Sequence, residues 1–175
     1  MNIQRGSAEM QAVEMFRDEQ IAMAQQAILQ ICDVWMDPAE TGWTPTATDV
    51  CSEVRFLHDW EGRFSLECSR GLAEVLANAM LMRPMEEISE SDVQDVIGEL
   101  LNTIAGNLKC LLPADTELTI PETMERSRKP QSIGCSEDRC REERGIVLSC
   151  EIGVIRMAFS RCEPAIAHGS SAGFA

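Results

Sequence analysis

Apolar residues recur at helical spacing in three stretches of the chain. The first stretch, residues 8–36, has an apolar stripe made of Met10, Val13, Phe16, Ala24, Ile28, Ile31 and Trp35. Residues three and four apart share one face of a helix, so this stripe predicts an amphipathic helix that packs on the core. Asp37-Pro38 and the polar residues after it are expected to end the helix. Gly71–Met82 is predicted to be a second helix, buried and rich in methionine.

The third helix is predicted to begin at Ser89. A serine at this position can accept a hydrogen bond from a free amide of the first helical turn. Ser91 and Gln94 have the spacing of a capping box one turn later. Leu112-Pro113 is expected to end the helix, because the residue before a proline disfavours helical geometry.

Alternating apolar and polar residues predict strands on both sides of the two central helices. Residues 50–56 and 64–68 alternate around a turn that contains Gly62, which predicts an antiparallel hairpin. The C-terminal third is expected to hold a short strand at 116–121, a charged irregular segment at 122–131, a strand within 132–139 and a second hairpin at 144–161 with Gly153 in its turn.

The order of these elements is helix, two strands, two helices and then three or four strands. Strands grouped in hairpins, with helices between them, indicate an α+β fold in which helices pack on a mostly antiparallel sheet. A chain of 175 residues can bury a real core, and we expect one domain over residues 1–164. The small, polar segment 165–175 is expected to be a disordered tail.

The composition narrows the classes of partner. The chain has 29 acidic and 15 basic residues, a formal net charge of −14. Such a surface repels the phosphates of nucleic acids and of anionic lipids, so we expect neither a nucleic acid nor a membrane as a partner. No run of about 18 uncharged apolar residues is present, so no membrane-spanning helix is expected.

The eight cysteines mostly lie in apolar runs, and the N-terminus has no leader-peptide pattern. Reduced thiols and a cytoplasmic location are therefore expected. With two histidines in the chain, no metal site is expected. The spacing of Cys135 and Cys140 leaves a thiol-based redox sensor open as one reading.

The stretch DVIGELLNTIAGN, residues 95–107, belongs to the third helix but holds two glycines and two asparagines, which are poor helix formers. On a helical wheel the apolar residues Val93, Ile97, Leu100, Ile104, Leu108 and Leu111 share one arc. Asp95, Glu99, Asn102 and Gly106 lie opposite, at spacings of four, three and four, and are expected to form one exposed ridge. Gly106 would let another surface approach closely. An acid and an amide on an exposed helical face are also common where they are only solvated, and the spacing alone leaves both readings open.

The motif Asp95-x3-Glu99-x2-Asn102, followed by Gly106, resembles the signature of the CheC/CheX chemotaxis phosphatases. The preceding hairpin and the buried helix that ends near Met82 are similar to CheX in particular. The resemblance covers roughly residues 45–161. The family pattern places a proline some two dozen residues after the asparagine, whereas the nearest candidate here, Pro121, follows Asn102 by 19 residues.

CheC-type relatives carry two copies of this motif on two equivalent helices. The other helix of this chain has only Glu74 and Asn78, which are four residues apart where the motif requires three. The resemblance therefore implies a single site, as in CheX.

The resemblance implies an enzyme, an aspartyl-phosphate phosphatase that dephosphorylates a CheY-like response regulator in chemotaxis or another two-component system. Asn102 would position a water molecule, Glu99 would engage a lysine of the regulator, and Asp95 and Gly106 would contact the partner. The chain would bind no cofactor itself, because the regulator would supply Mg²⁺. A homodimer is also implied. FliM and FliY share this architecture, so a non-catalytic module that binds a regulator or a flagellar switch component stays open.

Overall fold

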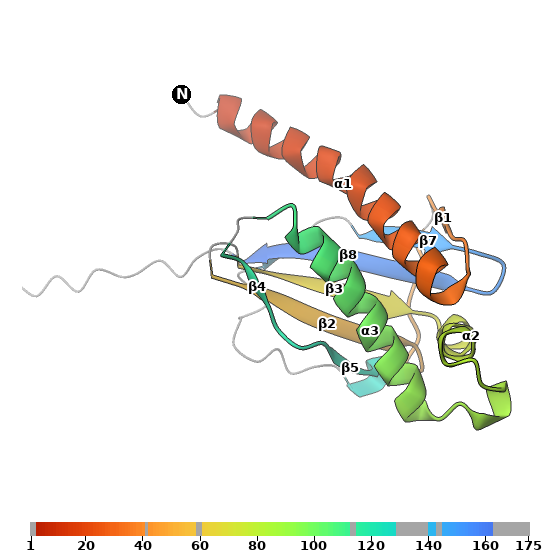
Figure 1. Cartoon of the computed structure of the whole chain (residues 1–175). Coiled ribbons are helices and arrows are strands. Elements are labelled where there is room, and N and C mark those ends of the chain that lie inside the picture. The colour runs from red at the N-terminus through yellow and green to blue at the C-terminus, as the bar shows by residue number, and fades with distance from the viewer. Residues whose placement is uncertain are drawn as a thin grey trace, which may run out of the picture.

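The structure is a computed structural model that describes residues 3–40, 42–58, 61–112, 115–128, 140–142 and 145–162. Three α-helices lie on one face of a sheet (Figure 1); they are α1 (Ile3–Cys32), α2 (Arg70–Leu81) and α3 (Glu90–Lys109). The described strands are β1 (Asp37–Pro38), β2 (Val50–Leu57), β3 (Gly62–Cys68), β4 (Glu117–Leu118), β5 (Glu122–Glu125), β6 (Cys140–Glu142), β7 (Ile146–Ser149) and β8 (Val154–Cys162). Two 3-10 turns are η1 (Met85–Glu87) and η2 (Arg126–Arg128).

The described strands form one antiparallel sheet in the order β1-β7-β8-β3-β2-β4, with β5 also paired to β2 and β6 to β8. The two hairpins expected from the sequence are both present, β2 with β3 and β7 with β8. The α+β fold with helices on a mostly antiparallel sheet is therefore confirmed. The segments 132–139 and 165–175, predicted as a strand and a disordered tail, lie outside the described residues.

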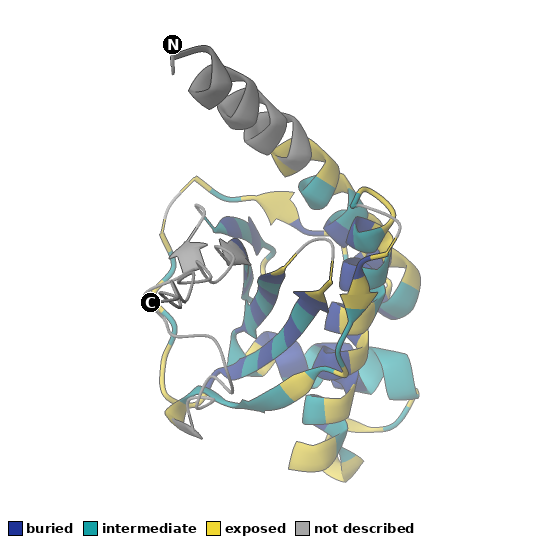
Figure 2. Ribbon diagram, turned by 90° about the vertical axis from the view of Figure 1, so that its left-hand side faces the viewer, coloured by how far each residue is buried: buried dark blue, intermediate teal, exposed yellow. Residues whose placement is uncertain are grey.

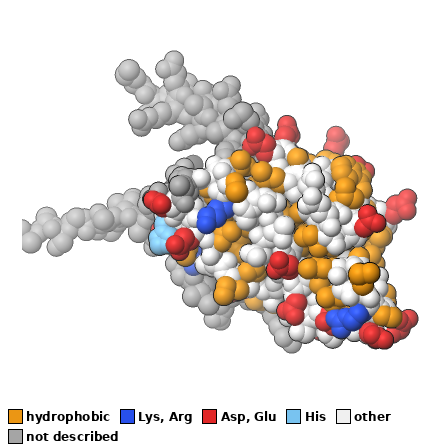
Figure 3. All heavy atoms as spheres, viewed as in Figure 1, with side chains coloured by type: hydrophobic (Ala, Val, Ile, Leu, Met, Phe, Trp, Pro, Cys, Tyr) orange, Lys and Arg blue, Asp and Glu red, His pale blue; other side chains and the backbone are white. Residues whose placement is uncertain are grey.

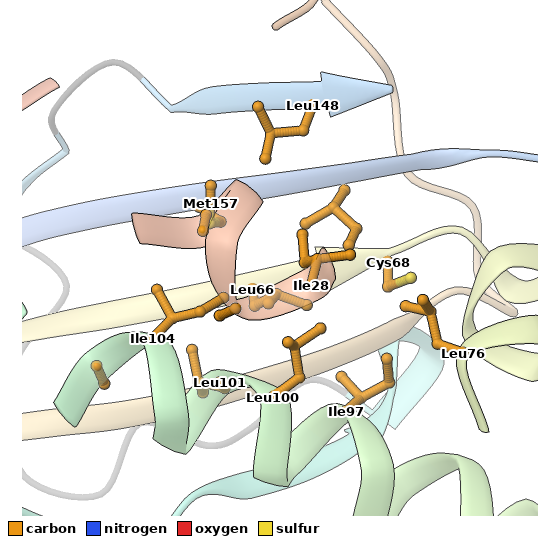
Figure 4. Close-up of a cluster of buried hydrophobic side chains, with 14 of the residues drawn as sticks. Ile28, Leu66, Cys68, Leu76, Ile97, Leu100, Leu101, Ile104, Leu148 and Met157 are labelled. Atoms are coloured by element: carbon orange, nitrogen blue, oxygen red, sulfur yellow. The ribbon is translucent and has the colours of Figure 1, made fainter. Parts of the chain in front are cut away.

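The core lies between the helices and one face of the sheet. Buried and half-buried residues alternate along β2 and β3, and Figure 2 shows this as dark blue and teal bands on the central strands. The close-up in Figure 4 shows Ile28 of α1, Leu76 of α2 and Ile104 of α3 among side chains from the sheet, such as Leu66 and Met157. The apolar arc of α3 predicted from the sequence is buried from Val93 to Leu108. Leu111, which the wheel also placed in this arc, is 37% exposed because α3 ends at Lys109.

The start of α3 is held by a capping box between Ser89 and Asp92. The Ser89 hydroxyl accepts a hydrogen bond from the Asp92 amide at 3.2 Å, and the Asp92 carboxylate accepts one from the Ser89 amide at 2.9 Å. Arg83 forms an ion pair with the same carboxylate. Ser89 is thus the N-cap, as predicted, whereas the predicted box of Ser91 and Gln94 is wrong: both residues already lie inside the helix, and the Gln94 amide donates to Glu90.

The edge of the sheet beside β2 is formed by two segments in succession. Leu118 of β4 pairs with Phe56, and Glu122 of β5 pairs with Glu53. Three residues, 119–121, therefore lie opposite the two residues 54–55, so this edge contains one additional residue, as in a β-bulge. The prediction that residues 122–131 are irregular is wrong for 122–125, which form β5, and the strand predicted at 116–121 is regular only at Glu117–Leu118.

Helix α3 comes very close to β5 at Gly98. A Cβ atom at this position would lie 2.9 Å from Thr123 Oγ1 and 3.8 Å from Pro121 Cβ. The same Thr123 hydroxyl is hydrogen-bonded to the hydroxyl of Ser52 on β2 at 2.8 Å, and Ser52 is fully buried. A side chain at position 98 would therefore have to displace a hydroxyl that already has a buried partner.

The N-terminal helix ends earlier than the sequence predicts. It was expected over residues 8–36, but α1 stops at Cys32, and Asp33 adopts a left-handed conformation with φ of 55°. Since the helical period does not continue, Trp35 is 53% exposed and donates a hydrogen bond to Asp37, while Met36 is buried. The side chains of Met10, Val13 and Phe16 lie outside the described residues.

Helix α2 was expected to be buried and rich in methionine up to Met82. Its buried residues are Leu72, Ala73, Leu76 and Ala77. Met82 is 92% exposed, because it is the C-cap in a left-handed conformation and its side chain leaves the packed face.

The two glycines of α3 should respond differently to alanine. At Gly106 no atom lies within 4 Å of an added Cβ, so Gly106→Ala should raise the free energy of unfolding by roughly 0.5–1 kcal/mol through helix propensity alone. Gly98→Ala gains the same helix propensity, but the added methyl group must disturb the hydrogen bond between the Thr123 and Ser52 hydroxyls. Leaving a buried hydroxyl without its partner costs about 1–3 kcal/mol.

Urea unfolding of the two variants measures this difference, and Gly106→Ala is the matched control for the intrinsic effect of the substitution. We expect Gly98→Ala to be less stable than Gly106→Ala by about 1 kcal/mol or more. Equal stabilities would show that α3 and β5 do not require a glycine at this contact.

The capping box predicts an acid-sensitive contribution to stability. Hydrogen bonds from the Ser89 hydroxyl, the Ser89 amide and the Arg83 guanidinium lower the pKa of the Asp92 carboxyl from 3.8 to about 2. The unfolded state then binds the proton more readily, so this contribution is present above about pH 4 and is lost as the pH falls toward 2. The difference in free energy of unfolding between the parent and Asp92→Asn should shrink over this range. Parallel stability curves for the two proteins between pH 5 and pH 2 would contradict the assignment.

Candidate functional site

Three of the four ridge residues are exposed as the sequence predicts, on the side of α3 opposite its buried apolar arc. Asp95, Glu99 and Asn102 are exposed, whereas Gly106 is half-buried and has open space where a Cβ would stand. Glu99 and Asn102 are one helical turn apart, so their side chains point in nearly the same direction. The carboxamide of Asn102 is thus displayed from a rigid element of 20 residues that is anchored on its opposite side.

A groove runs between this ridge and the edge of the sheet, with a volume of about 590 Å³. One wall comes from α3, and its lining residues are Gln94, Asp95, Gly98, Glu99 and Asn102. The other wall comes from the edge segment, with Leu118, Thr119, Ile120, Pro121 and Thr123. The ridge is therefore one side of an open concave surface.

The groove is negatively charged. Within the described part of the chain, neither Asp95 nor Glu99 forms an ion pair. Figure 3 shows acidic and hydrophobic side chains intermixed over this face, with basic side chains only toward its ends. Two unpaired carboxylates beside a neutral amide favour a partner that brings a cationic group to this wall.

The edge segment contributes residues that the sequence analysis did not assign to the site. Pro121 was noted only as an early match to a family proline, and it lies in the wall opposite the ridge. Thr119, Ile120 and Thr123 were missed. Their sequence carries no local signal for this role, because their position depends on pairing with β2, more than 60 residues earlier.

The polar residues of α2 take part in internal contacts instead of forming a second site. Glu74 forms an ion pair with Arg70 at 2.7 Å, and Arg70 also reaches Glu90 of α3 at 2.5 Å. The Asn78 side-chain amide donates to the backbone carbonyl of Arg83, beyond the end of α2. Both side chains are therefore engaged within the protein, Glu74 inside α2 and Asn78 with the segment that follows α2.

Other chemically reactive groups lie apart from the groove. Burial raises the pKa of the Cys32 and Cys51 thiols to about 11 and that of Cys68 well above its usual range, which keeps all three protonated. Cys135, one half of the redox reading, lies outside the described residues. His58 lies 3.2 Å from the Glu117 carboxylate in an exposed pair, which contributes little to stability.

Two searches over the described residues bear on metals and membranes. In the part of the chain that the structure describes, no three His, Cys, Asp or Glu side chains gather as metal ligands. None of the helices in that part has the length and apolar character required to cross a bilayer.

Known proteins resemble this chain in sequence pattern and in fold. The family model described as chemotaxis phosphatase CheX matches residues 50–136. No protein of curated function matches the chain by sequence.

Several solved structures share its fold. The chemotaxis protein CheX from Vibrio vulnificus is 18% identical with a TM-score of 0.63, and the match covers 81% of this chain and 93% of that one. CheX from Borrelia burgdorferi, solved in a complex with CheY, BeF3 and Mg²⁺, is 15% identical with a TM-score of 0.63, covering 83% and 97%. The FliM middle domain from H. pylori is 7% identical with a TM-score of 0.59, covering 87% and 90%. The family model thus assigns residues 50–136 to the CheX family, and the solved structures show that the chain shares the CheX fold.

Proposed function

We propose that this protein is a phosphatase that hydrolyses the aspartyl phosphate of a CheY-like response regulator. The observation that carries the proposal is the exposed pair of Glu99 and Asn102 on α3, which line an open groove on the protein surface. The match to the CheX family model supports it, and so does a relative of the same fold that was solved with CheY.

Asn102 positions the attacking water. Its carboxamide oxygen accepts a hydrogen bond from the water, and the side chain carries no negative charge that would repel the phosphoryl oxygens. The oxygen of the water forms a bond to phosphorus while the bond between phosphorus and the aspartyl oxygen breaks. The products are inorganic phosphate and the free aspartate carboxylate of the regulator. Phosphoryl transfer depends mostly on positioning and electrostatic stabilisation, and one outward-pointing amide on a rigid helix supplies the positioning.

Glu99 orients the complex by binding a lysine of the regulator. It stands one turn from Asn102 and has no ion-pair partner among the described residues, so its carboxylate is available to a partner. Asp95, one turn further, flanks this contact, and the open space at Gly106 lets the regulator approach the helix closely. The regulator supplies the lysine and the Mg²⁺ that neutralises the phosphoryl oxygens, and this chain binds no cofactor of its own. The homodimer implied by the family resemblance stays a prediction.

A second function is a binding module without catalysis. The similarity of the fold to the FliM middle domain favours it, because the same architecture occurs in that protein too. Binding of a regulator that leaves the lifetime of its acyl phosphate unchanged would support this function instead.

Asn102→Ala should abolish the acceleration of dephosphorylation. Addition of the parent protein to the acyl-phosphorylated CheY-like regulator encoded nearest to this gene should speed release of phosphate in the presence of Mg²⁺. We expect the variant to be slower by about 100-fold or more, because a misplaced water loses most of the advantage of positioning.

Asn107→Ala is the matched control, since Asn107 is exposed on the same helix but lies about 140° around its axis from Asn102. It should retain the rate of the parent. Asn102→Asp tests the need for a neutral amide at nearly constant shape and should also be slow. Asn102→Ala with the same activity as the parent would refute the catalytic assignment, while no acceleration by the parent would refute the proposed function.

Glu99→Gln should weaken the productive complex. A hydrogen bond to a charged group is worth about 1.5–3 kcal/mol, so loss of the pair with the lysine of the regulator should lower kcat/KM by about 10-fold or more. Glu86→Gln removes the same charge from an exposed residue outside the groove and controls for the change in long-range repulsion. Equal effects of the two substitutions in a steady-state assay would mean that Glu99 acts only through net charge.

A further inference from the structure

Ile120 is 86% exposed and lies at the edge of the sheet, between β4 and β5. It is one of the residues that form the wall of the groove opposite Glu99 and Asn102. A single exposed apolar residue needs no explanation by itself. Ile120 requires an explanation for two reasons: it lies beside the proposed site, and its backbone is held in place there.

The backbone around Ile120 is fixed on both sides. The Thr119 amide donates to the Arg55 carbonyl at 3.0 Å, and the Thr119 hydroxyl accepts from the Arg55 amide at 3.0 Å. On the other side Pro121 has a fixed φ and lies against Gly98 of α3. The additional residue between β4 and β5 breaks the alternation of this edge, and such bulges turn a side chain in a new direction.

A rigidly displayed apolar side chain can bind a partner at low entropic cost. Its backbone is already ordered, so the complex loses little additional conformational freedom when the side chain is buried. Ile120 carries no group that could act on a phosphoryl oxygen or a water. Its contribution is therefore to affinity and not to the chemical step.

The charges of the groove decide between two occupants. In a symmetric contact the same patch faces itself, so a second copy of this chain would place Asp95 and Glu99 near the same carboxylates of the partner. A protein with a lysine that faces Glu99 and an apolar pocket that receives Ile120 would complement both walls of the groove. A receiver domain engaged by Glu99 through its lysine meets the first of these conditions.

We propose that Ile120 is the apolar anchor of the docking surface for the receiver domain of the response regulator, and that it sets affinity without taking part in hydrolysis. This inference rests on the proposed function. The segment Thr119–Pro121 then acts as the second half of the site, with α3 as the first.

Calorimetric titration with the CheY-like regulator encoded nearest to this gene, loaded with beryllium fluoride and Mg²⁺, tests the anchor. Ile120→Ser should raise the Kd about 10- to 100-fold, the loss expected when an aliphatic side chain is no longer buried. Met82→Ser is the matched control, because Met82 is 92% exposed but does not line the groove, and it should bind like the parent. In the hydrolysis assay Ile120→Ser should raise KM by a similar factor and leave kcat within about twofold, as expected for uniform binding.

The outcomes separate this inference from the proposed function. Equal Kd values for Ile120→Ser and the parent overturn the anchor, even if the parent hydrolyses the acyl phosphate. A weaker Kd in Ile120→Ser, with no hydrolysis by the parent, supports the anchor and overturns the phosphatase. A fall in kcat at unchanged KM overturns the division of roles. If Ile120→Ser instead shifts a monomer–dimer equilibrium in sedimentation experiments, the occupant is a second copy and the inference is wrong.

Discussion

The close contact between α3 and the edge of the sheet at Gly98 is the constraint on which the groove depends. Burial of the apolar arc draws α3 onto the sheet, and the missing side chain at Gly98 lets it settle against Thr123. The Thr123 hydroxyl remains satisfied there by Ser52, so the contact leaves no buried polar group without a partner. Because the ridge lies on the same helix, the position of this contact also sets how far Asn102 stands from the opposite wall.

The two glycines of α3 therefore have separate purposes. Gly98 faces inward and allows the helix to approach β5, whereas Gly106 faces an open space on the side of the ridge. Each costs helix propensity, and the capping box at Ser89 and the long buried arc offset that cost. Gly98 thus serves an internal contact, whereas in the proposed function the open space at Gly106 is the clearance for the regulator.

The proposed site is formed by a helix and by the segment between β4 and β5. Asn102 and Glu99 offer polar groups from a rigid helix, and the segment with Ile120 offers an apolar surface held by hydrogen bonds to β2. Helix α2 does not repeat this arrangement, since Glu74 and Asn78 already bind within the protein. In this proposal, the positioning of the water and the affinity for the regulator come from different elements of the same surface.

The sequence by itself determined the fold class, the start of α3 and the outward face of the ridge, because helical period, strand alternation and an N-cap serine are local properties of neighbouring residues. The end of α1, the strand β5 and the places of Gly98 and Ile120 were decided only by the tertiary structure. Local patterns could not give them, since each depends on contacts between segments far apart in the chain. Thr119 lies beside Arg55, and Gly98 lies over Thr123, only once the strands have paired and α3 has packed on the sheet. The polar wall of the groove could therefore be read from one helix, whereas its apolar wall required pairing across more than 60 residues.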